Sequence, residues 1–274
     1  MKKRSWLSVI FVFIASLSPR LKRFLWKWWY NLLAQKDTGE DLLLMNYGYA
    51  SDDLRIMLYP EDEPYRYSLQ LYDHVVDGVD LSGKNVLEVG SGRGGGAGYM
   101  ACYLQPAQVV GVDLSMEAVL RSRVVFERPN LSFKQGAAED LPVLSESMDV
   151  VVNVESSHCY PDMGKFLQEV MRVLHPGGYF AFCDMRSRGD MGQLREKFRN
   201  TGFEVVKWED ITPNVLKALD HVADERGRKI LEKVPPFLRA CIADFTGLKG
   251  TAVYNLFQDG KYLYVCALLR KPAA

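Results

Sequence analysis

Glu88, Asp113, Glu155 and His158 are the residues best suited to chemistry, and each lies at or just after the end of an apolar run. Glu88 precedes Gly90 by two residues, and Asp113 follows Gly90 by 23. An acid before a glycine-rich turn suits a cationic amino-acid group, and an acid after the next strand can reach ribose hydroxyls. His158 can take a proton near neutral pH. The spacing therefore predicts a nucleoside-bearing cofactor with proton transfer beside it.

The stretch NVLEVGSGRGGG, residues 85–96, predicts a buried strand, a tight turn and the start of a helix. Gly90 and Gly92 let the backbone turn sharply and approach a ligand closely. Gly90, Gly92 and Gly95 also fit the dinucleotide spacing, so this stretch alone does not separate NAD(P) from S-adenosylmethionine (SAM). Glu88 and the later blocks favour SAM, and those blocks read GAAEDLP, MDVVVNVE, RVLHPGG and YFAFCD.

Alternating strands and helices must position these residues, which predicts an α/β fold with a doubly wound parallel sheet and helices on both faces. We expect strands at 86–89, 109–114, 131–135, 148–155 and 179–184, and helices at 65–79, 94–103 and 116–126. Ser115 is expected to cap the last of these helices. Ligands bind such sheets at the carboxyl ends of the strands. The residues expected to converge there are Glu88, Gly90, Gly92, Asp113, Ala138 and those from Asn153 to Glu155.

The segment NVESSHCYPD, residues 153–162, carries the residues expected to act on the acceptor. SAM brings an activated methyl group, so the protein must hold an acceptor in line with it and exclude water. A hydroxyl acceptor must also lose a proton, and His158 is the predicted base; the alternative is a hydrogen-bonded structural histidine. Glu155 is expected to orient His158, to act as the base itself or to cap the next helix. Tyr160 and Asp184 are further pocket candidates.

Three runs carry a more specific resemblance: residues 62–99, residues 149–180 and the later VPPFLRACIADFTGLKGT. They resemble the phthiotriol and phenolphthiotriol dimycocerosate methyltransferases, which O-methylate a hydroxyl on a long-chain diol lipid and lie near the sterol C-methyltransferases and small-molecule methyltransferases. The similarity runs from about residue 21 to residue 269. It implies a class I, Rossmann-like sheet of seven strands with an N-terminal helical cap. The segments 202–211 and 261–270 would be the last two strands, the final one antiparallel, with a lid between them.

The resemblance also assigns cofactor contacts by position. Glu88, Gly90 and Gly92 would contact the amino-acid end of SAM, and Asp113 the ribose. Asn153 would lie beside the cofactor, and the adenine side would be formed by Ala138 and Glu139. Such enzymes commonly carry Asp where this chain has Ala137, so adenine recognition must rest on backbone groups or on Glu139.

The N-terminus differs in composition from the rest of the chain. Between Arg4 and Arg20 lie 15 uncharged residues, which as a helix span roughly 22 Å, short of a hydrocarbon core of about 30 Å. We expect an uncleaved membrane anchor at 1–20, with a cleaved signal peptide or a soluble role as alternatives. Basic and aromatic residues alternate in 21–33, which suits a membrane interface or a helix packed over the active site. The catalytic domain would then face the cytosol at a membrane, or be cytoplasmic if no anchor forms.

The composition of the chain limits the classes of partner and ligand that we expect. The chain has 274 residues, with 34 acidic residues against 34 Lys and Arg, which gives no reason to expect nucleic acid. The five cysteines are odd in number and lack a CxxC pair, so we expect them reduced, and we predict no metal site. The oligomeric state stays open.

These observations predict a division into an anchor at 1–20, a cap at 21–80, a SAM-binding core at 81–210, a lid at 211–260, and a last core strand with the tail at 261–274. The lid is longer than an ordinary connection. Its apolar residues would line the acceptor pocket or only anchor the lid, and they are Phe237, Leu238, Ile242, Phe245 and Tyr254.

We therefore expect a SAM-dependent methyltransferase acting on a hydrophobic small molecule or lipid, most simply by O-methylation of a hydroxyl. C- or N-methylation of a sterol, prenyl-lipid or amine is the alternative within enzymes, because fold does not fix the acceptor. A membrane-associated protein that binds SAM without turnover is the alternative outside them.

Overall fold

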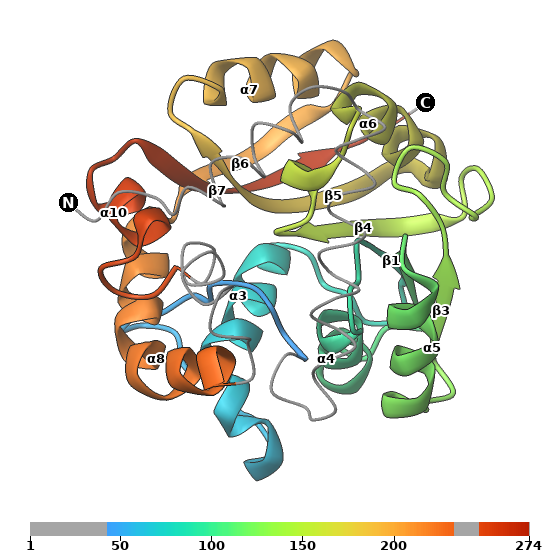
Figure 1. Ribbon diagram of the computed structural model, residues 1–274. Helices are drawn as coiled ribbons and strands as arrows, with labels where there is room; N and C mark the ends of the chain where they lie inside the picture. The colour runs from blue at the N-terminus through green and yellow to red at the C-terminus, as the bar shows by residue number, and fades with distance from the viewer. Residues whose placement is uncertain (1–42, 233–246, 274) are drawn as a thin grey trace.

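The computed structural model describes residues 43–232 and 247–273, which form a seven-stranded sheet in the order β3-β2-β1-β4-β5-β7-β6 with helices on both faces (Figure 1). This confirms the expected Rossmann-like fold. Several predictions lie outside the described residues: the anchor at 1–20, the basic and aromatic segment at 21–33, and the lid residues Phe237, Leu238, Ile242 and Phe245. Within the described ranges, no helix is both long enough and apolar enough to cross a membrane.

Four parallel strands form the half of the sheet that holds the glycine-rich turn: β1 (Asn85–Val89), β2 (Gln108–Asp113), β3 (Leu131–Gln135) and β4 (Met148–Val154). Leu87 of β1 is paired with Val110 of β2 and with Val151 of β4, and its side chain is fully buried. Helices cover both faces of a parallel sheet, which is why the central strands β1 and β4 are mostly apolar, whereas the edge strand β3 is not.

The other half of the sheet contains the one antiparallel strand. β5 (Leu174–Ser187) pairs with β4 in parallel, and β7 (Tyr262–Arg270) runs antiparallel to both β5 and β6 (Glu204–Asp210). The expected antiparallel final strand is confirmed. β5 begins five residues earlier than predicted, since Leu174 already pairs with Met148 ahead of an irregularity in the register.

Two apolar clusters hold the helices to the sheet. α3 (Arg66–Val76), α4 (Gly95–Tyr103), α8 (Thr212–Glu232) and α10 (Ala252–Gln258) lie on one face, and α6 (Met163–Val173) and α7 (Met191–Asn200) lie on the other (Figure 1). α5 (Met116–Val125) packs beside β3, and the 3-10 helices are η1 (Pro60–Tyr65) and η2 (Ser157–Cys159). Successive strand residues alternate between the clusters, as Val86 and Leu87 do, because side chains alternate across a strand.

Side chains and glycines set the helix ends. The Ser115 hydroxyl accepts a hydrogen bond from the Ala118 amide at 3.3 Å, which confirms the predicted cap of α5. Asp162, and not Glu155, caps α6 by accepting from the Lys165 amide at 3.0 Å. α3 ends at Val76 and not at Val79, because Gly78 takes a left-handed conformation with φ of 93°.

The segment from 43 to 50 packs beside the first turn of α3. The Asn46 amide donates to the Ser68 carbonyl at 3.2 Å, and the Tyr49 N–H donates to the Tyr67 carbonyl at 2.9 Å. Ala50 and Asn214 exchange two hydrogen bonds at 3.2 and 3.0 Å, which tie the segment to α8. The five-part division of the chain stays a prediction.

Candidate active site

The turn after β1 is locked to the end of β2. The Gly90 N–H donates to the Val112 carbonyl at 2.8 Å, and the Gly92 N–H donates to Asp113 Oδ2 at 2.9 Å. Gly90 has a φ of 76°, and a Cβ at this position would lie 2.4 Å from Ser156 Oγ. Only glycine fits there, because a side chain would be both strained and in collision.

Asp113 lies where the sequence predicts it, at the carboxyl end of β2, and it is half-buried. Its Oδ1 accepts from the Ser115 N–H at 2.8 Å, while its Oδ2 accepts from Gly92. Burial raises the pKa of this carboxyl, and the amides of Ser115, Gly92 and Leu114 oppose that rise. Each carboxylate oxygen has two lone pairs and so can still accept a hydrogen bond from a hydroxyl.

Glu88 is 1% exposed and points to the face that α3 and α4 cover. Its Oε1 accepts a 2.7 Å hydrogen bond from the Tyr72 hydroxyl, whereas its buried Oε2 makes no hydrogen bond within the described residues. Burial raises the Glu88 pKa to about 7, although Tyr72 and the nearby Ala97 amide favour the ionised form. Tyr72 is absent from the sequence-predicted site. The signal that could have found it is the glycine run, since a Cβ on Gly96 would lie 2.1 Å from the Tyr72 ring.

Asn153 is fully buried, and its amide nitrogen contacts three protein oxygens. The distances are 2.9 Å to the Val89 carbonyl, 2.8 Å to Ser156 Oγ and 2.9 Å to the Tyr160 hydroxyl. Asn153 thus stabilises the glycine turn, because its side chain donates to the carbonyl that directly precedes Gly90. Its predicted contact with the cofactor stays a prediction, and Oδ1 is the atom that makes no hydrogen bond in the described part of the chain.

Ala138 and Glu139 lie in the loop after β3, which is joined to the end of β2 by a 3.0 Å bond from the Gly136 N–H to the Asp113 carbonyl. Ala138 is buried in the same apolar cluster as Val112. The structure therefore brings the predicted adenine side next to the predicted ribose contact.

His158 and Asp184 form a pair that the sequence did not assign. His158 Nδ1 lies 2.8 Å from Asp184 Oδ1, and the His158 backbone N–H donates to Asp184 Oδ2 at 2.9 Å. Asp184 is completely buried and also accepts from the Ser157 hydroxyl and the Met185 N–H. The Arg186 guanidinium lies 3.1 Å from its Oδ2. Asp184, and not Glu155, is therefore the residue that orients His158.

The pKa directions describe a buried ion pair. Burial alone would raise the pKa of Asp184, but Arg186 and His158 hold it well below its usual range. Burial would lower the pKa of His158, but Cys159 and Asp184 together raise it well above its usual value. An ionised carboxylate only accepts, so the neutral His158 ring keeps its proton on Nδ1. Nε2 is then the basic nitrogen.

Glu155 follows β4 in a left-handed conformation, with a φ of 45°. Its Oε1 accepts from the Tyr47 N–H and from the Tyr264 hydroxyl, so it links the segment at 43–50 to β7. Burial raises its pKa to about 7, while Tyr264 and Tyr47 oppose the shift. The expected roles of Glu155 as orienter of His158 and as helix cap are wrong, because Asp184 and Asp162 take them. Its role as an acid or base stays a prediction.

The two residues that donate to Glu155, Tyr47 and Tyr264, belong to a cluster of aromatic rings. The Tyr47 ring meets the Phe257 ring edge-on at 5.9 Å, and the Phe257 and Tyr264 centroids are 6.2 Å apart. Tyr254, a predicted lid residue, is buried and donates to Asp220 of α8 at 2.9 Å. Its contacts are those of a residue that anchors α10 on α8.

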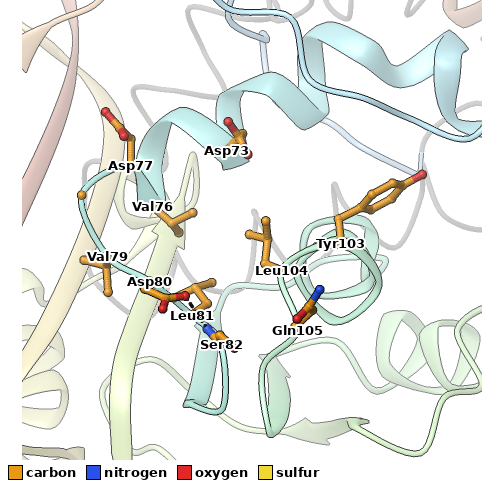
Figure 2. Close-up of a pocket in the computed structure, with 11 residues that line it drawn as sticks. Asp73, Val76, Asp77, Val79, Asp80, Leu81, Ser82, Tyr103, Leu104 and Gln105 are labelled. Carbon is orange, nitrogen blue, oxygen red and sulfur yellow. Dashed lines mark hydrogen bonds between the residues drawn. The ribbon is translucent and has the colours of Figure 1, made fainter.

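A hollow of about 450 Å³ lies at the opposite edge of the sheet, near the amino end of β1 (Figure 2). Its three aspartates already contact protein groups. Asp73 accepts from the Tyr99 hydroxyl at 2.8 Å, Asp80 accepts from the Ser82 N–H at 2.9 Å, and Asp77 lies 3.6 Å from Lys207. Ligands of such sheets bind at the other edge, so this hollow is not our candidate site. The described residues contain no cluster of three or more His, Cys, Asp or Glu that could hold a metal ion.

Comparison with known proteins gives these features a family. A family model described as a methyltransferase domain matches residues 87–182. The phthiotriol/phenolphthiotriol dimycocerosates methyltransferase of Mycobacterium leprae (strain TN) is 34% identical over 254 residues, which are 92% of this chain and 94% of that protein. The chain belongs to this family of SAM-dependent methyltransferases. The fatty-acid O-methyltransferase of Mycolicibacterium smegmatis is 37% identical over 210 residues, which are 76% of each protein.

The SAM-dependent methyltransferase fold also appears among solved structures. The crystal structure of the [4+2]-cyclase SpnF matches with a TM-score of 0.71 at 20% identity, over 94% of this chain and 97% of that one. At this identity the match shows the fold alone. Family membership makes this methyltransferase an enzyme with SAM as its cofactor, so the alternative of binding without turnover is wrong.

Proposed function

We propose that this methyltransferase O-methylates a hydroxyl group on a hydrophobic, lipid-derived acceptor. The observation that carries the proposal is the pair formed by His158 and Asp184, because a hydroxyl acceptor needs a base and this pair supplies one. The names of two relatives support the acceptor class, since one is a phthiotriol methyltransferase and the other a fatty-acid O-methyltransferase.

The residues around the glycine turn fit SAM. Glu88 Oε2, which is buried and makes no hydrogen bond to any residue that the structure describes, would accept from the ammonium group, and the Asp113 carboxylate would accept from the ribose hydroxyls. The bends at Gly90 and Gly92 would bring backbone groups close to the amino-acid end of SAM. SAM supplies an activated methyl group to whatever nucleophile is held in line with it.

His158 would take the acceptor proton on Nε2. Asp184 holds the ring through Nδ1, and Ser157 and Arg186 hold Asp184 in turn. The reaction needs the neutral imidazole, so the raised pKa of His158 predicts a rate that increases with pH through that pKa. The positive charge of bound SAM would favour the neutral ring, because like charges disfavour the charged form.

C- or N-methylation is the second candidate, and the surroundings of Glu155 favour it. A carboxylate bonded to Tyr47 and Tyr264, whose rings pack with that of Phe257, could stabilise a positive charge on the acceptor. In that chemistry Glu155, and not His158, would be the residue whose loss abolishes turnover.

Contact with a membrane surface through residues 1–33 is also proposed, since it would bring the enzyme to such an acceptor. Its support is the sequence alone. Deleting residues 1–33 should move the protein from the membrane fraction to the supernatant; full-length protein found only in the supernatant contradicts the proposal.

Labelled SAM tests the proposed acceptor. The purified enzyme is incubated with a total lipid extract and, separately, with aqueous metabolites, and label should enter the lipid phase alone. His158→Ala should lower turnover by about a hundredfold or more while SAM affinity is kept. A carboxylate acceptor is already deprotonated, so label in the lipid phase that is insensitive to His158→Ala points to an acid and overturns the hydroxyl.

A further inference from the structure

We propose that Tyr72 is a positioning residue for SAM, which fixes the Glu88 carboxylate and directs its Oε2 toward the cofactor's ammonium group. The inference rests on the assignment of Glu88 to the amino-acid end of SAM, and goes beyond it to a residue on α3, outside the nucleotide-binding motif. It is carried by the geometry of one hydrogen bond, one oxygen without a hydrogen bond and one close ring contact.

The hydrogen bond fixes the orientation of the carboxylate. The Tyr72 hydroxyl donates to Glu88 Oε1 at 2.7 Å, and both residues are at least nine-tenths buried. One oxygen is thereby occupied from the α3 side. The other, Oε2, is left without a hydrogen bond in the described structure, which is a costly state for a buried acceptor. A cationic ligand group would relieve that cost.

The Tyr72 ring is itself held by the glycine run. A Cβ on Gly96 would lie 2.1 Å from the Tyr72 Cζ, so the first turn of α4 packs directly on the ring. The hydroxyl therefore has little freedom to leave Glu88. The run GGG at 94–96 thus has two structural roles: it forms the turn, and it lets α3 approach α4 closely.

The charges around Glu88 make this bond matter. Tyr72 faces it from α3, the Ala97 amide from α4, and the acid Asp113 from β2. Glu155 at the end of β4 and Cys183 of β5 lie near Tyr72. Asp113 disfavours a second negative charge, and burial disfavours any charge, so the donors are what favour ionisation of Glu88. Tyr72 is the side-chain donor among them.

The test is the pH dependence of cofactor binding. S-adenosylhomocysteine carries the same amino-acid end and transfers no methyl group, so its dissociation constant can be measured by calorimetry between about pH 6 and 9. Wild-type affinity should fall as the pH drops through about 7, where Glu88 takes up a proton. In Tyr72→Phe this fall should begin about one pH unit higher, and affinity at pH 7 should be about fivefold weaker.

Tyr99→Phe is the matched control. The Tyr99 hydroxyl also donates to a carboxylate at 2.8 Å, but that carboxylate is Asp73 of α3 and not Glu88, and Tyr99 is equally buried. Its variant should lose similar stability and keep the wild-type pH profile. Glu88→Gln should bind weakly with no pH step near 7.

Two results overturn the inference. One is a Tyr72→Phe profile that superimposes on the wild type, and the other is uniform weakening at every pH, which would make Tyr72 a packing residue only. Wild-type binding in Glu88→Gln would remove the assignment on which the inference rests. Because no acceptor is present, all of these outcomes are independent of whether the enzyme methylates a lipid hydroxyl.

Discussion

Glu88 and Asp184 are both buried carboxylates at the active-site edge of the sheet, on opposite faces, and their surroundings differ sharply. Asp184 accepts hydrogen bonds from Ser157, from His158 and from the Met185 amide, and it lies beside the Arg186 guanidinium. Its pKa is held well below its usual range, against the effect of burial. Glu88 accepts its side-chain hydrogen bond from Tyr72 through Oε1, with the Ala97 amide nearby, and burial raises its pKa to about 7.

The comparison separates two uses of a buried acid. A carboxylate surrounded by protein donors is fixed in place and can orient a neighbour, as Asp184 orients His158. A carboxylate left with one oxygen unsatisfied is in a costly state that a cationic ligand relieves. We propose that the first kind serves the acceptor side of the site and the second kind the SAM side.

Breaking the Asp184 side should have the largest effect. Asp184→Asn should lower turnover by at least about a hundredfold, because His158 loses its anionic partner. The pKa of His158 should fall, so the rise of kcat with pH should move to lower pH. Asp149→Asn is the control, since Asp149 accepts from the Asn85 amide at the far end of β4. Unchanged kcat in Asp184→Asn would contradict the proposed pair.

Substitution of Glu88 should raise the stability of the cofactor-free protein while it weakens cofactor binding. A carboxyl with a raised pKa destabilises the folded state as the pH rises from its unfolded value of about 4.5 through about 7. Glu88→Gln removes this loss, so the cofactor-free variant should be up to about 3 kcal/mol more stable than wild type at pH 8. Denaturant unfolding at pH 5 and pH 8 measures the difference. Equal pH dependence in both proteins would show that Glu88 is not destabilised by burial.

Substitution of Gly90 tests the tight turn between β1 and α4. Gly90→Ala places a Cβ 2.4 Å from Ser156 Oγ at a φ of 76° and should cost about 3 kcal/mol of folding free energy. Gly83→Ala has a similar φ of 68° and meets nothing within 4 Å, so it should cost only about 1 kcal/mol. A similar loss of stability in both variants would mean that backbone strain alone, and not the collision with Ser156, explains the effect of Gly90→Ala.

The smallest effect is expected where Asp184 loses one donor of several. Ser157→Ala removes one hydroxyl but leaves His158, Met185 and Arg186 on the carboxylate. Turnover should fall by less than about tenfold, and stability by about 1 kcal/mol. A loss as large as that of Asp184→Asn would mean that the donors act as one inseparable unit.

The parts of this site that the sequence predicted are local ones. Gly90, Gly92 and Asp113 lie at the end of a strand or in the following turn, and short patterns identify such positions. The pair of His158 with Asp184 depends on the register of β4 against β5, where Val154 lies opposite Cys183. Twenty-six residues separate the partners in the sequence, and no local pattern records the register.

Long-range contacts account for the other misses. Tyr72 lies on the apolar face of the helix predicted at 65–79. Such a pattern indicates that the side chain is buried, but it does not indicate which residue the Tyr72 hydroxyl contacts. Glu155 meets Tyr47 and Tyr264, each more than 100 residues away. The seven-stranded, doubly wound sheet and its final antiparallel strand, in contrast, follow from the family resemblance and the strand pattern.

The identity of the methylated atom tests the central claim most directly. The enzyme is given SAM with a trideuterated methyl group and the lipid extract, and the labelled product is located by mass spectrometry and NMR. The account predicts a trideuteromethyl ether on a lipid oxygen, with its formation reduced in His158→Ala. A label attached to carbon or nitrogen, or formed equally well without His158, would contradict it.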